Sequence, residues 1–205
     1  IYKGLKPIYW CPDCETALAE AEIEYAEDKT NSIYVKFRVT EDNGVFADVS
    51  EKLSDIYFMI WTTTTWTLPG NVAIAVNPDY DYSLVKTADG TFVIASELVD
   101  SVMAVGGVSE YETIAEFKGR DFELMKCAHP FIDRESLVIL GDHVTLDAGT
   151  GCVHTAPGHG VEDYIACQNY KDIPIIVPVD DKGYLNELAG ELSGLYYEKS
   201  NAKIL

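Results

Sequence analysis

Two short stretches of this sequence gather side chains whose types and spacing could do chemistry. The first, Trp61–Asn71, reads WTTTTWTLPGN and sets four consecutive threonines between two tryptophans. The second, Gly149–Tyr164, reads GTGCVHTAPGHGVEDY and holds histidines, glycine turns and acidic residues. A buried hydroxyl without a partner costs about 1–3 kcal/mol, so either the protein or a ligand and water must satisfy such groups.

The threonine run follows an apolar stretch that is typical of a buried strand. If this strand continues, alternate threonines point to opposite faces, with Thr62 and Thr64 on one of them. Thr63 and Thr65 then lie on the other face. Threonine is also favoured in strands for its shape alone. The run by itself therefore leaves a ligand-binding and a structural interpretation open.

The second stretch predicts a strand, a turn and the start of a helix. His154 lies on the strand, and a Pro157-Gly158 turn follows it. Gly158 and Gly160 allow the backbone to approach another group closely. Asp163 falls in the first turn of the expected helix, where the helix dipole favours a negative charge. Each residue also has an ordinary structural explanation, and His154 could be a satisfied histidine of the core.

Short strands are the elements expected to position these stretches. Alternating or continuous apolar runs end at turn residues, and the Asp89-Gly90 pair between two runs is a strong hairpin signal. The expected strands cover residues 33–39, 56–61, 72–76, 82–85, 91–94, 111–117, 136–140, 144–146, 152–155 and 175–179.

Helices are expected to be few. One is predicted from 97 to about 105, capped by Ser96, another from about 160 to 170, and a third near the C-terminus. This pattern predicts an α+β fold that is mainly β, with a barrel-like, mostly antiparallel β core and a few peripheral helices.

Composition and charge restrict the kind of partner. The 205 residues include 34 acidic and 15 basic side chains, a net charge of −19. Domains that grip nucleic acid by its phosphates are usually basic, so any nucleic acid must be held mainly by other means. We expect no signal peptide, and no stretch of the sequence approaches the ~20 apolar residues of a membrane helix. The chain starts without methionine, and we expect it to be part of a longer protein.

The cysteines suggest a reducing compartment and half of a metal site. Their odd number, five, without a secretory signal favours free thiols and a cytoplasmic location. Cys11 and Cys14 form a CxxC pair, which is half of a zinc site, and the chain has no second close pair. Cys152 and His154 could also form a nucleophilic pair. However, catalytic pairs usually come from separate elements.

The stretches Trp61–Asn71 and Gly149–Tyr164 resemble the two signature stretches of the connective-peptide editing domain that is inserted in isoleucyl-tRNA synthetases. We call them the signature stretches below. Lys6–Tyr25 resembles the segment where the chain leaves the catalytic core for this insert. Valyl- and leucyl-tRNA synthetases share the fold and a threonine-rich stretch, but they do not normally carry the sequence motif VHxAPGHG. Thr65 departs from the family pattern, which has proline there.

The resemblance implies a hydrolytic editing reaction. Isoleucine and valine differ by one methylene, and a hydrophobic pocket separates them by only about 1–3 kcal/mol, a limit for which this family is the standard example. A second site must therefore hydrolyse Val-tRNA(Ile) and exclude Ile-tRNA(Ile) by its size. Water can perform the ester hydrolysis when it is well placed and the ester oxygens are polarised.

The resemblance also implies roles at matching positions. Asp163, as a carboxylate, is expected to hold the ammonium of the misattached amino acid, and His154 to line the side-chain pocket and set its size. Trp61 is expected to form a wall of the pocket and Asn71 to help shape it. The hydroxyls expected to contact the terminal adenosine, the ester and the attacking water are those of Thr62, Thr63, Thr64 and Thr67.

The expected organisation follows from the same resemblance. Residues 1–205 form a single editing domain excised from a larger synthetase, and 1–25 and about 190–205 are its junctions to the catalytic core. The expected partners are the acceptor end of tRNA(Ile) carrying valine and the rest of the synthetase, which also binds ATP. We expect a monomer without membrane contact. Editing needs no cofactor, whereas zinc is possible at Cys11 and Cys14 in the full-length enzyme.

Two other interpretations remain open at this stage. The first is a zinc- or thiol-dependent hydrolase, which would bind stoichiometric metal or lose activity when Cys152 is alkylated. The second is a β-barrel domain that only binds or positions a partner. Such a domain would hydrolyse no aminoacyl ester.

Overall fold

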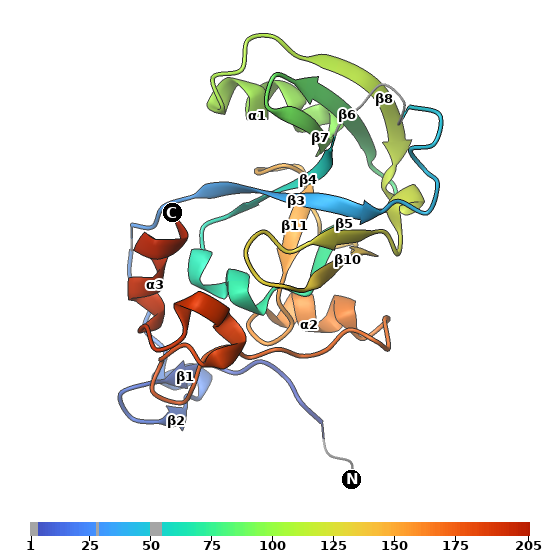
Figure 1. Cartoon of the computed structure of the whole chain (residues 1–205). Helices are drawn as coiled ribbons and strands as arrows, with labels where there is room; N and C mark the ends of the chain where they lie inside the picture. Colours follow the sequence, from blue (N-terminus) through green and yellow to red (C-terminus); the bar gives the residue numbers. More distant parts are fainter. Residues whose placement is uncertain (1–3, 28, 50–54) are drawn as a thin grey trace. The chain divides into compact units, whose positions relative to one another are not determined.

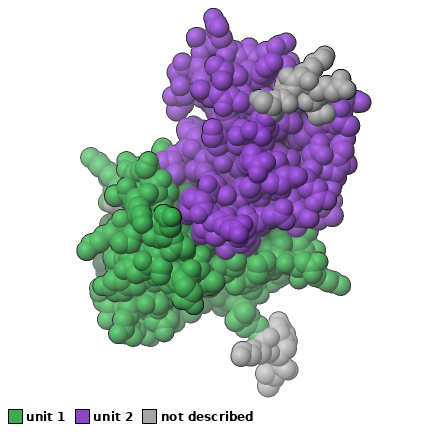
Figure 2. Space-filling model, viewed as in Figure 1, with its two compact units in different colours: residues 1–32, 63–71, 156–205 green, residues 33–62, 72–155 purple. Residues whose placement is uncertain are grey.

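The computed structural model describes residues 4–27, 29–49 and 55–205. These residues form two compact units. Unit 1 comprises residues 1–32, 63–71 and 156–205, and unit 2 comprises 33–62 and 72–155. Figure 2 colours the two units separately. The threonine run and the second signature stretch each have residues in both units, because the chain crosses between units after Thr62 and after Thr155.

Unit 2 is built around a closed β-barrel of six strands (Figure 1). The strand order is β11-β5-β10-β9-β3-β4, and β4 pairs again with β11 to close the ring. Most pairs are antiparallel, but β10–β5 and β11–β4 are parallel. The barrel strands are β3 (Ile33–Glu41), β4 (Ile56–Thr62), β5 (Ala73–Val76), β9 (Lys126–Ala128), β10 (Glu135–Leu140) and β11 (Cys152–Thr155).

Three further strands extend the sheet from β4. β7 (Gly90–Ala95) pairs with β4, β6 (Asp81–Thr87) with β7, and β8 (Glu112–Lys118) with β6. The hairpin expected at Asp89-Gly90 joins β6 to β7, and Gly90 has a φ of +136° that a residue with a side chain rarely adopts. The helix α1 (Val99–Val105) packs beside these strands (Figure 1), and its Val102 and Met103 join a buried apolar cluster.

The chain enters and leaves the barrel at one of its ends. Ile33 at the start of β3 pairs with Thr62 at the end of β4. Trp61 pairs with Val153 near the end of β11, and the Val72 N–H, just before β5, donates to the Thr155 carbonyl at 3.1 Å. Apolar side chains such as Phe58 and Ile60 fill the interior behind this end. The barrel therefore brings a residue of each signature stretch to the same rim.

Unit 1 consists of short elements joined by turns. The small hairpin of β1 (Trp10–Cys11) and β2 (Thr16–Ala17) precedes the 3-10 turn η1 (Glu20–Glu22). The remaining elements of this unit are η3 (Thr65–Gly70), α2 (Val161–Cys167), η6 (Glu187–Leu192) and α3 (Tyr197–Ile204). Two further 3-10 turns lie among the described residues of unit 2, namely η4 (Ser96–Leu98) and η5 (Gly119–Phe122).

The structure confirms the predicted fold class, a mainly β protein with a barrel-like core and few helices. The three expected helices are present as α1, α2 and α3, although Ser96 opens the 3-10 turn before α1 and does not cap the helix. No helix within the described residues is long and apolar enough to cross a membrane.

Two sequence-based expectations about strands are wrong. Residues 175–179 form no strand, because Pro174 before them and Pro178 within them have no N–H for a ladder, and only Val179 makes an isolated bridge. Residues 144–146 lie in a turn region, where the Val144 N–H donates to Gly141. The threonine run does not continue β4, because the strand ends at Thr62 and the 3-10 turn η3 begins at Thr65.

Candidate functional site

Trp61 and Thr62 lie at the rim of the barrel. Trp61 is held between Tyr34 of β3 and Val153 of β11 in the strand register. Gly149 packs on its indole, since a Cβ added there would lie 3.2 Å from the Trp61 ring. Thr62 is the last residue of β4 and is buried. The first residues of the two signature stretches are thus packed against each other inside unit 2.

His154 is buried in β11, where it lies opposite Ile74 of β5. It shares one face of the strand with the buried Cys152, as the period of a strand predicts, whereas Val153 between them is partly exposed. Only 9% of the His154 surface is exposed. Because the strands on both sides fix its backbone, His154 is a rigid group at the rim of the barrel.

The later threonines belong to unit 1 and differ in exposure. Thr63 and Thr64 are exposed, and the Thr63 carbonyl accepts a hydrogen bond from the Thr30 hydroxyl at 2.7 Å. Thr67 is buried, and its hydroxyl donates to the Thr64 carbonyl at 2.8 Å. The segment between β4 and η3 therefore presents Thr63 and Thr64 to solvent or ligand, whereas Thr67 within η3 fixes the backbone of the turn.

Asn71 ends η3 and is completely buried. Its N–H donates to the Leu68 carbonyl at 2.9 Å and completes the last turn. This burial is compatible with the expected role of Asn71 in shaping the pocket.

Asp163 occupies the first turn of α2, as predicted. Its Oδ2 accepts the Ala156 N–H at 2.9 Å, which fixes the carboxylate against the loop that follows β11. Gly160 is required for this arrangement, because a Cβ there would lie 2.6 Å from the same oxygen. Gly158 likewise allows the Ile176 carbonyl to approach, at 2.4 Å from an added Cβ. The close approaches expected of the two glycines are thus found within unit 1.

A cavity of about 520 Å³ lies within unit 1 and is lined in part by Thr64 and Thr67. His159, which the sequence analysis did not single out, lines it as well. Its ring meets the Trp66 ring edge-on at 5.0 Å, and its buried Nε2 has no hydrogen-bond partner among the described residues. The signal that could have found it is that it is the second histidine of the VHTAPGHG segment, directly after a glycine.

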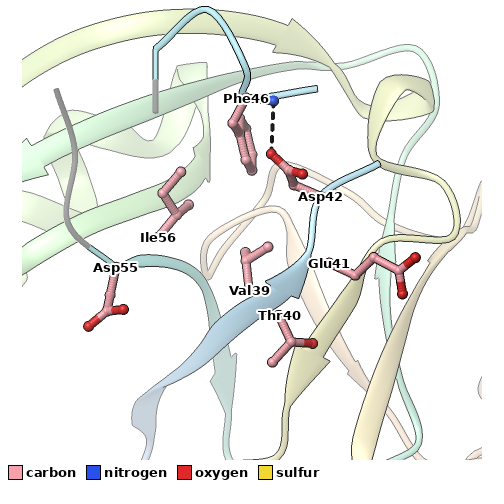
Figure 3. Close-up of a pocket in the computed structure, with 7 residues that line it drawn as sticks. All are labelled: Val39, Thr40, Glu41, Asp42, Phe46, Asp55 and Ile56. Carbon is pink, nitrogen blue, oxygen red and sulfur yellow. Dashed lines mark hydrogen bonds between the residues drawn. The ribbon is translucent and has the colours of Figure 1, made fainter. Parts of the chain in front are cut away.

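A second pocket, of about 410 Å³, lies at the other end of the barrel (Figure 3). Two of its acidic groups, Asp42 and Glu41, already have partners. Asp42 accepts the N–H groups of Gly44 and Phe46, and Glu41 pairs with Lys126 at 2.6 Å. This pocket contains no residue of either signature stretch, so we do not assign it to the site.

Comparison with protein families decides the relationship. The model of the class I tRNA synthetases for I, L, M and V matches residues 1–156. The chain belongs to this family. Proteins named isoleucine–tRNA ligase match it over its whole length, with 64% identity in Caldicellulosiruptor saccharolyticus and 57% in Thermoanaerobacter pseudethanolicus. The chain spans 22% of the length of these relatives.

Solved structures of leucyl-tRNA synthetase domains have the same fold. The crystal structure of GlLeuRS-CP1 superposes with a TM-score of 0.67 at 15% identity, covering 85% of this chain and 94% of that one. The editing domain of the cytosolic leucyl-tRNA synthetase of P. knowlesi gives 0.58 at 13% identity, covering 72% and 66%. At these identities the comparison establishes the fold alone.

Thr65, the residue that departs from the synthetase pattern, fits its surroundings. It is the first residue of η3, a position at which proline is also tolerated. Its hydroxyl donates to the Asn201 side chain of α3, a contact that proline cannot make. The backbone therefore keeps its turn with threonine, and the substitution adds a bond between η3 and α3 within unit 1.

The thiol-dependent alternative is not supported by the site. Burial raises the pKa of the Cys152 thiol far above its ordinary value, so the thiol stays protonated and a poor nucleophile at neutral pH. Its sulfur lies near the Val93 carbonyl. Cys127 and His129 have the same spacing as Cys152 and His154, with one residue between them. His129 has a structural role, because its Nδ1 accepts the N–H groups of Phe131 and Ile132.

The CxxC pair provides only part of a zinc site. Cys11 and Cys14 lie in one turn, where the Cys14 N–H points to the Cys11 sulfur at 3.4 Å, and Cys14 is exposed. No group of three or more potential ligands occurs in the part of the chain that the structure describes.

We expect the 205-residue chain not to hold zinc tightly. Two thiolates leave a tetrahedral site half filled, and the 205 residues hold no second close cysteine pair. Metal analysis after mild chelation should give much less than one zinc per chain, with Cys11→Ser as the background control. One zinc per chain, lost in Cys11→Ser, would contradict the prediction.

His159 should make the stability of the chain depend on pH. Burial lowers the pKa of its imidazole from 6.5 to about 4. Between these values the unfolded state binds more protons, so the free energy of unfolding falls as the pH is lowered from about 6.5 towards 4. Urea unfolding at pH 7 and pH 5 should show the native chain losing about 1–2 kcal/mol more than His159→Phe. Equal losses would contradict this assignment.

Proposed function

We propose that this chain is the editing domain of an isoleucine–tRNA ligase. In this proposal it hydrolyses the ester of valine mistakenly attached to tRNA(Ile) and spares the ester of isoleucine. The matches to isoleucine–tRNA ligases along the whole chain support the parent enzyme, and the likeness of fold to leucyl-tRNA synthetase editing domains supports the activity.

The pairing of β4 with β11 is the observation that carries the proposal. These strands lie side by side in parallel, with Trp61 opposite Val153. Thr62 and His154, one from each signature stretch, therefore occupy neighbouring strands at the same rim of the barrel. A threonine-rich segment and a rigid buried ring at one rim suit the hydrolysis of a small ester in a pocket of limited size.

The proposed reaction needs no covalent intermediate. A water molecule attacks the carbonyl carbon of the ester, the bond from this carbon to the ribose oxygen breaks, and a proton from the water goes to that oxygen. Thr62, Thr63 and Thr64 supply neutral donors and acceptors for the water, the ester and the terminal adenosine. The products are free valine and uncharged tRNA.

Two groups give the proposed reaction its selectivity. Asp163 holds the ammonium of valine, and its carboxylate is oriented in advance by the Ala156 N–H. His154 limits the size of the side chain, with Trp61 as a further wall. The two groups are linked closely along the chain, because only one residue separates His154 from Ala156, whose N–H orients Asp163.

Deacylation of Val-tRNA(Ile) and Ile-tRNA(Ile) tests the proposal. The full-length ligase that carries this chain should hydrolyse the valine ester much faster than the isoleucine ester, and the 205-residue chain is compared in parallel. The rate should not change on chelation of metals or on alkylation of exposed thiols. If neither ester is hydrolysed above the uncatalysed rate, the chain is a binding module and the proposal fails.

A further inference from the structure

The cavity of unit 1 has walls that the proposed editing reaction does not use. Its aromatic lining consists of Tyr9, Trp10, Trp66 and Tyr197. Trp66 lies between two other rings, with its centroid 4.9 Å from that of Tyr197 and 5.0 Å from that of His159. Cavities of this volume, about 520 Å³, fall in the range that binds small ligands.

One side of this cavity is formed by the threonine run. Thr64 and Thr67 line it together with Trp66, which lies between them in η3. Thr64 is one of the hydroxyl residues to which the proposed function assigns the terminal adenosine and its ester, and the Thr67 hydroxyl donates to the Thr64 carbonyl. A ligand in the cavity would therefore adjoin the group bound at the threonines.

The cavity does not suit the amino acid itself. A pocket that distinguishes valine from isoleucine must fit a few methyl groups closely. Here the walls include Tyr9 and Trp10, whose side chains are 58% and 40% exposed. Wide, partly exposed aromatic walls match a flat ring system better than a small aliphatic side chain.

The charges of the cavity argue against an anion as the main anchor. Lys6 is the one cation among its described lining residues, and Asp180 and Asp181 are also present. Asp180 Oδ1 accepts the Lys182 and Tyr184 N–H groups, and the Asp181 carbonyl accepts the Trp10 indole N–H at 2.8 Å. Binding would depend on stacking, as in proteins that hold single strands by their bases.

We propose that this cavity binds the base of the nucleotide that precedes the terminal adenosine of the tRNA acceptor strand, a cytosine. The base stacks on the Trp66 side of the cavity, while the adenosine and its ester lie at the threonines. This inference rests on the proposed function, because it takes the threonine run as the place of the terminal adenosine.

The test uses two probes and the indole signals of the 205-residue chain. The dinucleotide CpA represents the last two nucleotides, and AMP represents the terminal one. The chain has three tryptophans, so ¹H–¹⁵N spectra resolve Trp10 and Trp66 in the cavity and Trp61 in the barrel. CpA should shift the Trp10 and Trp66 signals and bind at least about 5-fold more tightly than AMP.

Substitutions in the cavity distinguish binding of the preceding base from binding of the terminal adenosine. Trp66→Leu should lower the affinity for CpA to that for AMP and leave AMP binding unchanged. Tyr9→Ser should weaken CpA in the same direction, and its 58% exposure makes it safe for folding. Tyr111→Ser, an exposed tyrosine of unit 2 outside the cavity, serves as the control and should change neither affinity.

Two results would overturn the inference. If CpA binds no more tightly than AMP, the cavity does not hold the preceding base. If Trp66→Leu and Tyr9→Ser weaken both probes equally, the cavity holds the adenosine itself. The deacylation assay is separate from this test. If the native full-length ligase hydrolyses neither ester, the proposed function is refuted. The dependence of CpA binding on Trp66 is measured separately in the 205-residue chain, and its outcome decides only the inference about the cavity.

Discussion

Replacing Asp163 by alanine should nearly abolish the hydrolysis of Val-tRNA(Ile). The ammonium of valine would enter a partly dry pocket without its carboxylate and lose a charge-assisted bond worth about 1.5–3 kcal/mol. The rate should therefore fall by at least about 10–150-fold. Deacylation is measured in the full-length ligase, and aminoacylation with isoleucine in the same preparation should be unchanged, since it reports an intact enzyme.

The structural contact of Asp163 requires two companion variants. Because Oδ2 accepts the Ala156 N–H, alanine removes a loop contact together with the charge. Asp163→Asn keeps an oxygen that can accept this bond and removes only the charge, so it should lose nearly as much activity as alanine. Glu162→Ala removes an exposed acid from the same helical turn and should have little effect. Unchanged deacylation in Asp163→Asn would refute the assigned role.

The strands that carry the site could be predicted from the sequence because their patterns are local. The continuous apolar run before Thr62 and the Cys152–Thr155 segment are both found as strands. The placement of Asp163 in a first helical turn also follows from adjacent residues. Such signals depend on backbone preference and burial within a few positions of the chain.

The closure of the barrel could not be predicted in the same way. The ring depends on the parallel pairing of β4 with β11, and their paired residues Trp61 and Val153 are far apart in the sequence. No local pattern specifies which strand a given strand will pair with. The sequence also left open whether the threonine run continues β4, because threonine is compatible with a strand, whereas the chain here turns into η3.

The cavity of unit 1 shows a similar limit. Its walls come from the N-terminal segment, η3, the loop at His159 and the segment before α3. No single stretch of the sequence therefore predicts the cavity. The sequence did not identify His159, because it lies in a glycine-rich turn, where no helical or strand periodicity predicts which side chains are buried. Its importance emerges only from packing, where it contacts Trp66 and lies within 3.0 Å of a Cβ added at Gly70.

Replacing His154 by alanine should give the enzyme activity against its correct product, Ile-tRNA(Ile). The ring lies on β11 between fixed neighbouring strands, so it cannot move aside for an additional methyl group. Overpacking of that size costs about 1–3 kcal/mol, which lowers hydrolysis of the isoleucine ester by about 10–200-fold. Removing the ring removes the clash and leaves the threonines and Asp163 in place.

The same variant distinguishes a steric role from a catalytic one. In His154→Ala, hydrolysis of Val-tRNA(Ile) should fall modestly or not at all, whereas a general base predicts a loss of about 10²–10⁴-fold for both esters. His154→Phe is the matched control, because it keeps a ring of similar size without nitrogen. It should still exclude isoleucine and still hydrolyse the valine ester. If both rates collapse together in both variants, His154 belongs with the catalytic groups and the size-exclusion role is wrong.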